Sequence, residues 1–75
     1  MNDYELVGKK YTFDDGNAIE VIQIKERNIN EDGATLYVTY CIYQGISLPR
    51  KLVMTIKEFV ATYGHLFGYP NEYNQ

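Results

Sequence analysis

Residues 34–43 read ATLYVTYCIY, and this stretch decides the fold. Aliphatic and polar side chains alternate along it, and this period of two is typical of a strand with one face in a core. We predict that one set points into the core: Leu36, Val38, Tyr40 and Ile42. The other set forms an outer stripe: Thr35, Tyr37, Thr39, Cys41 and Tyr43.

Turn signals on both sides of this stretch indicate a meander of antiparallel strands. Asp32-Gly33 precedes it and is a strong hairpin signal, and Gln44-Gly45 follows it. Upstream, the segment 14–17 (Asp-Asp-Gly-Asn) has the composition of a tight turn. The predicted strands run over residues 4–13, 18–27, 34–43 and 46–54.

Three irregularities indicate that the sheet is bent. Gly8 predicts a bend or bulge in the first strand, and Pro49, which has no N–H, belongs at an edge or a bulge of the fourth. In the second strand, Ile19 and Val21 have one parity whereas Ile22 and Ile24 have the other. A bulge or bend between Val21 and Ile22 would keep both pairs inside.

One short helix is predicted over about residues 55–63. Thr55 and Glu58 have the spacing of a capping box, and Gly64 supplies a stop signal. The apolar face of this helix consists of Ile56, Phe59, Val60 and Tyr63. Leu66, Phe67 and Tyr69 are expected to close one end of the core.

The sequence therefore predicts a mainly β (α+β) fold. We expect a bent four- to five-stranded antiparallel sheet, or a small SH3-like barrel, with the helix at its C-terminal end. Residues 1–70 form a single domain in this interpretation, and residues 71–75 a mobile polar tail.

Composition limits the chemistry that the chain can support. Its 75 residues include one cysteine and one histidine, which excludes an internal disulfide and a Cys/His zinc cage. We expect no metal and no cofactor. No signal peptide or membrane-length apolar run is recognisable, so the expected location is the cytoplasm, or the host cytoplasm if a phage encodes the protein.

Charge is unevenly distributed along the chain. The formal net charge is −3, and the acidic residues concentrate in the first 33 positions. This balance disfavours non-specific binding to nucleic acid, which needs a basic surface.

Two segments carry a resemblance to a known group of proteins. The first runs from Val7-Gly8-Lys9-Lys10-Tyr11 through Gly16 to Val21-Ile22-Gln23-Ile24, and the second is Met54-Thr55-Ile56-Lys57-Glu58-Phe59 with Tyr63. Their layout resembles that of small uncharacterised SH3-like β-barrel proteins of bacteria and phages. The resemblance implies an accessory or regulatory protein and transfers no functional residue. The long uncharged third strand and Pro49 have no counterpart in that layout.

Candidate catalytic residues are few, and we expect no enzyme activity. His65 follows the helix stop without a nucleophile motif nearby, so a helix-end surface histidine is the simpler interpretation. Cys41 lies in mid-strand, where a buried or half-buried inert thiol is expected. The acid pairs at 14–15 and 31–32 have the composition of solvated turns rather than of a calcium loop.

Binding is the more promising function. Residues 34–49 contain no charge, although exposed edge strands usually carry charge to prevent pairing with other chains. The segment is therefore central, covered or used in binding. The predicted contact residues are Tyr37, Thr39 and Tyr43, with a protein partner or a second copy of the chain as the binding partner. The alternative is that this stripe is packed under the helix or inside a curved barrel.

Two further functions remain open from the sequence. One is an acidic DNA mimic that inhibits a nucleic-acid-binding enzyme through Asp14, Asp15, Glu20, Glu31 and Asp32. The other is a small nucleic-acid-binding barrel. In that barrel Tyr37 and Tyr43 would stack on bases, and the phosphate contacts would come from Arg50, Lys51 and Lys57.

Overall fold

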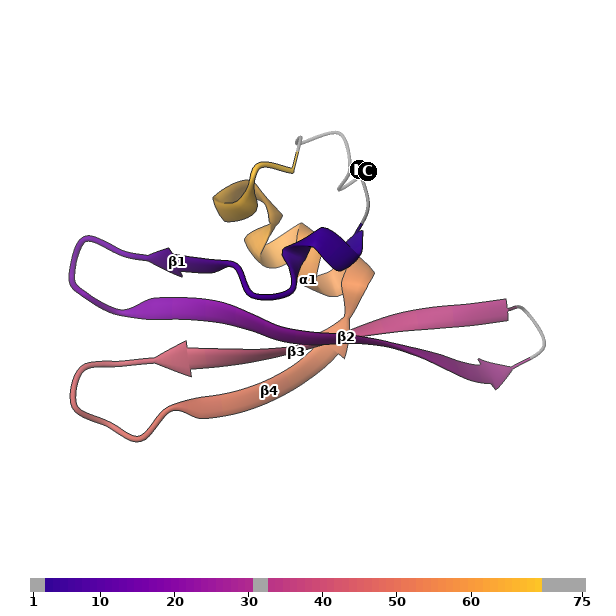
Figure 1. Ribbon diagram of the computed structural model, residues 1–75, viewed down its shortest axis with the longest axis horizontal. Helices are drawn as coiled ribbons and strands as arrows, with labels where there is room; N and C mark the ends of the chain where they lie inside the picture. The colour runs from indigo at the N-terminus through magenta and orange to yellow at the C-terminus, as the bar shows by residue number, and fades with distance from the viewer. Residues whose placement is uncertain (1–2, 31–32, 70–75) are drawn as a thin grey trace.

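Four antiparallel strands form one sheet in the order β1-β2-β3-β4 (Figure 1). The strands are β1 (Lys10–Thr12), β2 (Ala18–Asn30), β3 (Gly33–Tyr43) and β4 (Arg50–Thr55). The computed structural model describes residues 3–30 and 33–69, with backbone only at 28–30, 33 and 34. The uncharged strand β3 is central, between β2 and β4, which confirms one of the placements predicted for it.

Three short helices pack on the same side of the sheet. They are η1 (Asp3–Leu6), α1 (Ile56–Tyr63) and η2 (Gly64–Phe67), and the first and last are 3-10 helices. Figure 1 shows all three on one side of the strands. We call the sheet face beneath them the inner face and the opposite one the outer face. The predicted fold class, a bent antiparallel sheet with one short C-terminal α-helix, is confirmed.

The core lies between α1 and the inner face of β2 and β3. Phe59 is fully buried at its centre, and its ring lies 5.4 Å from the rings of both Tyr40 and Tyr63 and 5.9 Å from that of Phe67 (centroid distances). Leu36, Val38, Tyr40 and Ile42 all join this core or pack against it, as the alternation of β3 predicts. The helix face was also predicted correctly: Phe59 and Val60 are buried, and Ile56 and Tyr63 pack against the core.

A bulge in β2 lies at Ile22. Val21 pairs with Tyr40 and Gln23 with Thr39, so Ile22 is the extra residue. The prediction of a bulge here is confirmed, but the prediction that it keeps Ile22 inside is wrong, because this side chain is 39 % exposed. An inserted residue reverses the facing of everything after it, so Ile24 returns to the core while Ile22 is left outside.

The first predicted strand is mostly not a strand. Residues 3–6 form η1, whose Leu6 is 2 % exposed, and only Lys10–Thr12 pair with β2. Gly8, with φ of +89°, lets the chain turn from η1 toward β1. Its N–H donates to the carbonyl of Val21 (2.9 Å), and the N–H of Val21 donates to the carbonyl of Lys9 (2.9 Å). The turn thus satisfies backbone groups next to the bulge.

Strand ends also differ from the prediction. β2 continues to Asn30, which pairs with Gly33, so the predicted loop at 28–33 is largely a continuation of the hairpin. β4 begins at Arg50 instead of residue 46, and Pro49 belongs to the preceding loop. β4 pairs with β3 only from Tyr37 to Ile42. The end of the β2–β3 hairpin near the Asn30–Gly33 pair therefore extends beyond β4 (Figure 1). The predicted tail, 71–75, lies outside the described residues.

The two ends of α1 are formed differently. Thr55 is the N-cap as predicted: its Oγ1 accepts from the N–H of Glu58 (3.2 Å) and donates to Glu58 Oε1 (2.9 Å). Gly64 does not stop the chain in a left-handed conformation, since its φ is −56° and η2 begins there. It is glycine because a Cβ would lie 2.9 Å from Val60 Cγ1 and 3.1 Å from Tyr69 Cβ. The left-handed residue is Gly68, with φ of +90°.

Replacing the N-cap tests the capping box. Thr55→Ala should lower the free energy of unfolding by about 1 kcal/mol, because it leaves the Glu58 N–H without its acceptor. Urea denaturation followed by circular dichroism measures this. Thr55→Ser keeps the hydroxyl and should stay near wild type, and an equal loss in both variants would contradict the capping role.

Neighbouring residues test the position of the bulge. Val21→Thr should cost about 1–3 kcal/mol, because it buries a hydroxyl at a fully enclosed site. Ile22→Thr should change stability by no more than about 0.5 kcal/mol, since that side chain is already partly in water. Equal urea midpoints for the two variants would place the bulge elsewhere.

Candidate functional site

The outer face gathers positive charge. Its strand positions follow from the register, in which Lys10 pairs with Glu20, Lys25 with Tyr37, Arg27 with Thr35, and Lys51 with Cys41. Four of the seven Lys and Arg residues of the chain therefore share this face: Lys10, Lys25, Arg27 and Lys51. Glu20 is the one acid among the paired positions described on it. A chain with net charge −3 thus presents a cationic sheet face.

The predicted contact residues all lie on this face. Tyr37, Thr39 and Tyr43 are each half-buried, and they occupy alternate positions of β3. Tyr37 and Tyr43 are six positions apart, which corresponds to about 20 Å along an extended strand. Val53, the partner of Thr39 on β4, is 60 % exposed and adds apolar surface between the two tyrosines. The structure therefore brings the predicted residues together on one surface.

Cations from β1 and β2 cover one face of each tyrosine ring. The Nζ of Lys10 lies 4.9 Å from the ring centroid of Tyr43, and the guanidinium carbon of Arg27 lies 5.5 Å from that of Tyr37. Both distances are within the range of cation–π attraction. The sequence did not reveal these basic residues as part of the site, because they reach it only through strand pairing.

A hydrogen bond fixes the side chain of Tyr43. Its hydroxyl donates to Glu20 Oε1 at 2.8 Å. This bond, helped by partial desolvation and by the negative charge of Glu20, raises the pKa of Tyr43 to about 12. Tyr43 therefore keeps its proton, and its hydrogen bond to Glu20, to a higher pH than an ordinary tyrosine would.

The predicted acidic surface is divided by the fold. Glu20 lies on the outer face, whereas Asp14 and Asp15 belong to the turn between β1 and β2. Asp15 accepts hydrogen bonds from the backbone N–H (2.9 Å) and the side-chain amide (3.1 Å) of Asn17. Glu31 and Asp32 lie outside the described residues, and the Asn30–Gly33 pair that flanks them is at the opposite end of β2.

The candidate phosphate contacts of the nucleic-acid hypothesis are also separated. Lys51 shares the outer face with the tyrosines. Arg50 pairs with Ile42, an inner-face residue, and Lys57 is exposed on α1. The bases that lie over the rings of Tyr43 and Tyr37 are Lys10 of β1 and Arg27 of β2.

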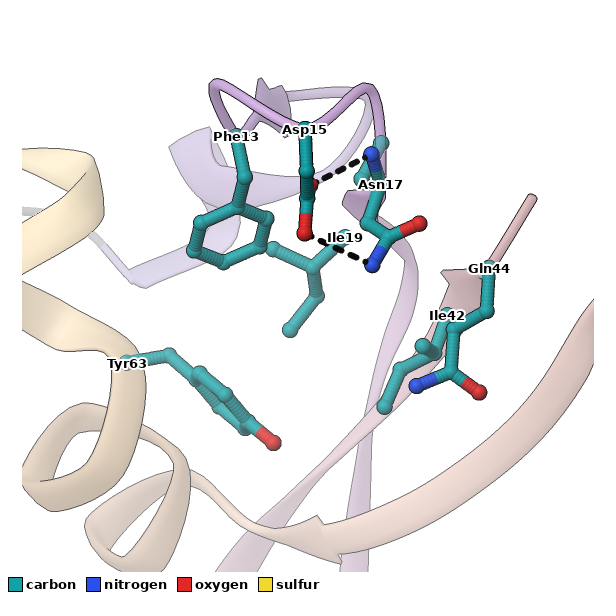
Figure 2. Close-up of a pocket in the computed structure, with 8 residues that line it drawn as sticks. Phe13, Asp15, Asn17, Ile19, Ile42, Gln44 and Tyr63 are labelled. Carbon is teal, nitrogen blue, oxygen red and sulfur yellow. Dashed lines mark hydrogen bonds between the residues drawn. The ribbon is translucent and has the colours of Figure 1, made fainter.

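A second feature is a cavity of about 300 Å³ at the end of the sheet, which we call the end pocket (Figure 2). Ile19 and Ile42 form its floor, and the rings of Phe13 and Tyr63 stand beside it. Its polar lining consists of Asp15, Asn17 and Gln44. No pattern in the sequence indicated this pocket, which combines a turn, two strand ends and the last residue of α1.

Of the two candidate catalytic residues, His65 lies apart from the outer face and the end pocket, and Cys41 is buried. His65 is exposed in η2, and Cys41 is 8 % exposed in mid-strand, so the expected burial of the thiol is confirmed. In the described ranges 3–30 and 33–69, no three His, Cys, Asp or Glu residues are close enough together to hold a metal ion. No helix in that part of the chain is long and apolar enough to cross a lipid bilayer.

Comparisons with protein families, curated proteins and solved structures find no match.

The raised pKa of Tyr43 predicts a pH dependence. In the unfolded chain a tyrosine loses its proton near pH 10, whereas folded Tyr43 keeps it until about pH 12. The hydrogen bond to Glu20 therefore stabilises the fold fully below pH 10, and this contribution decreases between pH 10 and pH 12. Urea midpoints measured at pH 9 and pH 11 should fall more steeply for wild type than for Tyr43→Phe. Parallel slopes would contradict this assignment.

Proposed function

We propose that this chain is a non-catalytic interaction module that binds an acidic surface of a partner protein on its outer face. The observation that carries the proposal is the grouping of Lys10, Lys25, Arg27 and Lys51 around Tyr37 and Tyr43 on a sheet face that none of the described helices covers. Antiparallel sheets often leave one face to solvent. Here the charged residues of that face are mostly cations, although the formal net charge of the chain is −3.

The contact chemistry of this face fits protein recognition. Tyrosine combines apolar area with a hydrogen-bonding tip and is enriched at the centres of interfaces. Thr39 and Val53 supply a shallow, uncharged centre between the tyrosines, with cations around it. Carboxylates on a partner would meet this cationic rim, which speeds association and fixes orientation more than it adds affinity.

The layout resemblance to small barrel proteins of bacteria and phages extends the proposal. It supports an accessory factor that binds and modulates or inhibits a host or viral protein. An acidic DNA mimic receives less support, because Glu20 and the Asp14-Asp15 turn belong to different parts of the surface.

Binding of single-stranded nucleic acid is the second candidate function, and the cationic outer face favours it more than the sequence did. Tyrosines beside basic residues form a stacking surface with phosphate contacts in many single-strand binders. Against it, Arg27 and Lys10 already occupy one face of each ring. We therefore place protein binding first.

Substitutions on the outer face, with a matched charge reversal on α1 as the control, test the proposal. The partner is first isolated from the native cell with wild-type protein and then purified for measurement of its dissociation constant by calorimetry. Lys51→Glu and Tyr37→Glu should each weaken binding at least tenfold, about 1.4 kcal/mol, because both place a negative charge on the outer face. Lys57→Glu makes the same charge change on α1 and should have less than a twofold effect.

Two results would contradict protein binding on the outer face. Equal affinities for Lys51→Glu and Lys57→Glu would remove the outer face as the binding surface. Retention of a single-stranded DNA oligonucleotide in a low-salt gel shift, lost in Lys51→Glu, would instead establish the second candidate. Circular dichroism of each variant confirms that the fold is kept.

A further inference from the structure

The loop between β3 and β4 carries two aliphatic side chains that are highly exposed to solvent. Ile46 is 106 % and Leu48 88 % exposed, the highest values among the large hydrophobic residues of the described chain. The loop, residues 44–49, is nevertheless held in place. The N–H of Ser47 donates to the carbonyl of Gln44 (3.0 Å), and the N–H of Gly45 donates to Asn17 Oδ1 (3.1 Å). Two neighbouring apolar side chains on a fixed loop form a protruding contact site.

The end pocket lies directly beside this loop. Gln44, which begins the loop, is part of the pocket lining, and Ile19 and Ile42 form an apolar floor. The volume of about 300 Å³ equals roughly ten water molecules at about 30 Å³ each, enough for an aliphatic side chain of four carbons. Neither Ile46 nor Leu48 of the same chain lines the pocket. One end of the molecule therefore carries both an apolar projection and an apolar recess.

The charges near these two features have opposite signs. The exposed residues Asp14 and Asp15 belong to the turn that borders the pocket, whereas the exposed Arg50 follows the loop directly. Both segments lie at the same end of the sheet (Figure 1). A recess flanked by carboxylates and a projection flanked by a cation are complementary in shape, polarity and charge.

We propose that two copies of the chain associate end to end, each inserting Ile46 or Leu48 into the end pocket of the other. A two-fold axis pairs the same patch on both subunits, so each projection meets a recess and each Arg50 meets an acidic turn. The assembly closes at two copies, since both complementary pairs are satisfied at once. The outer face is not part of this contact and remains available in the dimer.

The oligomeric state tests this directly. Light scattering over a concentration series should give a mass that rises toward twice the 8.7 kDa of the chain. Ile46→Asp combined with Leu48→Asp should weaken dimerisation at least tenfold while leaving the urea midpoint unchanged, because both side chains are already in water. Val53→Asp makes the same kind of change at an exposed aliphatic position of the outer face and should leave the dimer intact.

A charge exchange tests the geometry of the contact. Asp14→Lys and Arg50→Glu should each weaken the dimer, since each brings like charges together, and the double variant should restore it because the attraction is re-formed with reversed signs. A purely structural role of either residue would not produce this rescue. Raised salt should weaken the wild-type dimer but less so the Asp14→Asn variant.

Three results would overturn the inference. The first is a monomer at every concentration up to about 1 mM, a limit set by the weakest specific affinities. The second is a dimer that survives the changes at Ile46 and Leu48 but is lost in Tyr37→Glu, which would move self-association to the outer face. The third is a double charge variant no better than its parents. The first and third results leave the partner-binding measurement with Lys51→Glu unaffected, and Lys51 is not among the proposed dimer contacts, so the two proposals fail separately.

Discussion

The packing of Phe59 and Val60 against the inner face of β2 and β3 is the contact on which the rest of the structure depends. An eight-residue helix is unstable alone in water, and an antiparallel sheet needs at least one covered face. Each therefore supplies what the other lacks, in a chain whose single cysteine permits no disulfide. Leu6 of η1 and Tyr69 join the same core. Because all the described helices use their apolar side chains on this face, they leave the outer face uncovered.

The bulge at Ile22 links the core to the proposed binding surface. Before it, Ile19 and Val21 face inward; after it, Ile24 and Glu26 have the inward register, and Lys25 and Arg27 face outward. Without the extra residue, these two cations would have the parity of Val21 and would point toward the core. One inserted residue thus keeps aliphatic side chains buried along β2 and places positive charge beside Tyr37. Burial of apolar area and solvation of charge favour the same register.

The two proposed surfaces are independent in position and in chemistry. The outer face is broad, cationic and rich in tyrosine, whereas the end of the sheet combines a small apolar recess, an apolar loop and charges of both signs. Binding of a partner protein and pairing of two copies could therefore occur together. A dimer would present two outer faces, and two linked sites bind a divalent target far more tightly than either site alone.

The sequence by itself determined the features that are encoded by neighbouring residues. The alternation of residues 34–43 fixed which side chains of β3 are buried, and Thr55 with Glu58 fixed the start of α1. Tertiary structure decided the features that depend on distant residues: the short β1 in place of a strand over 4–13, the exposure of Ile22, and the role of Gly64 in close packing. The cationic face and the end pocket belong to this second group, because strand register and helix docking bring their residues together. Periodicity and capping are local, whereas register is chosen by the free energy of the whole core.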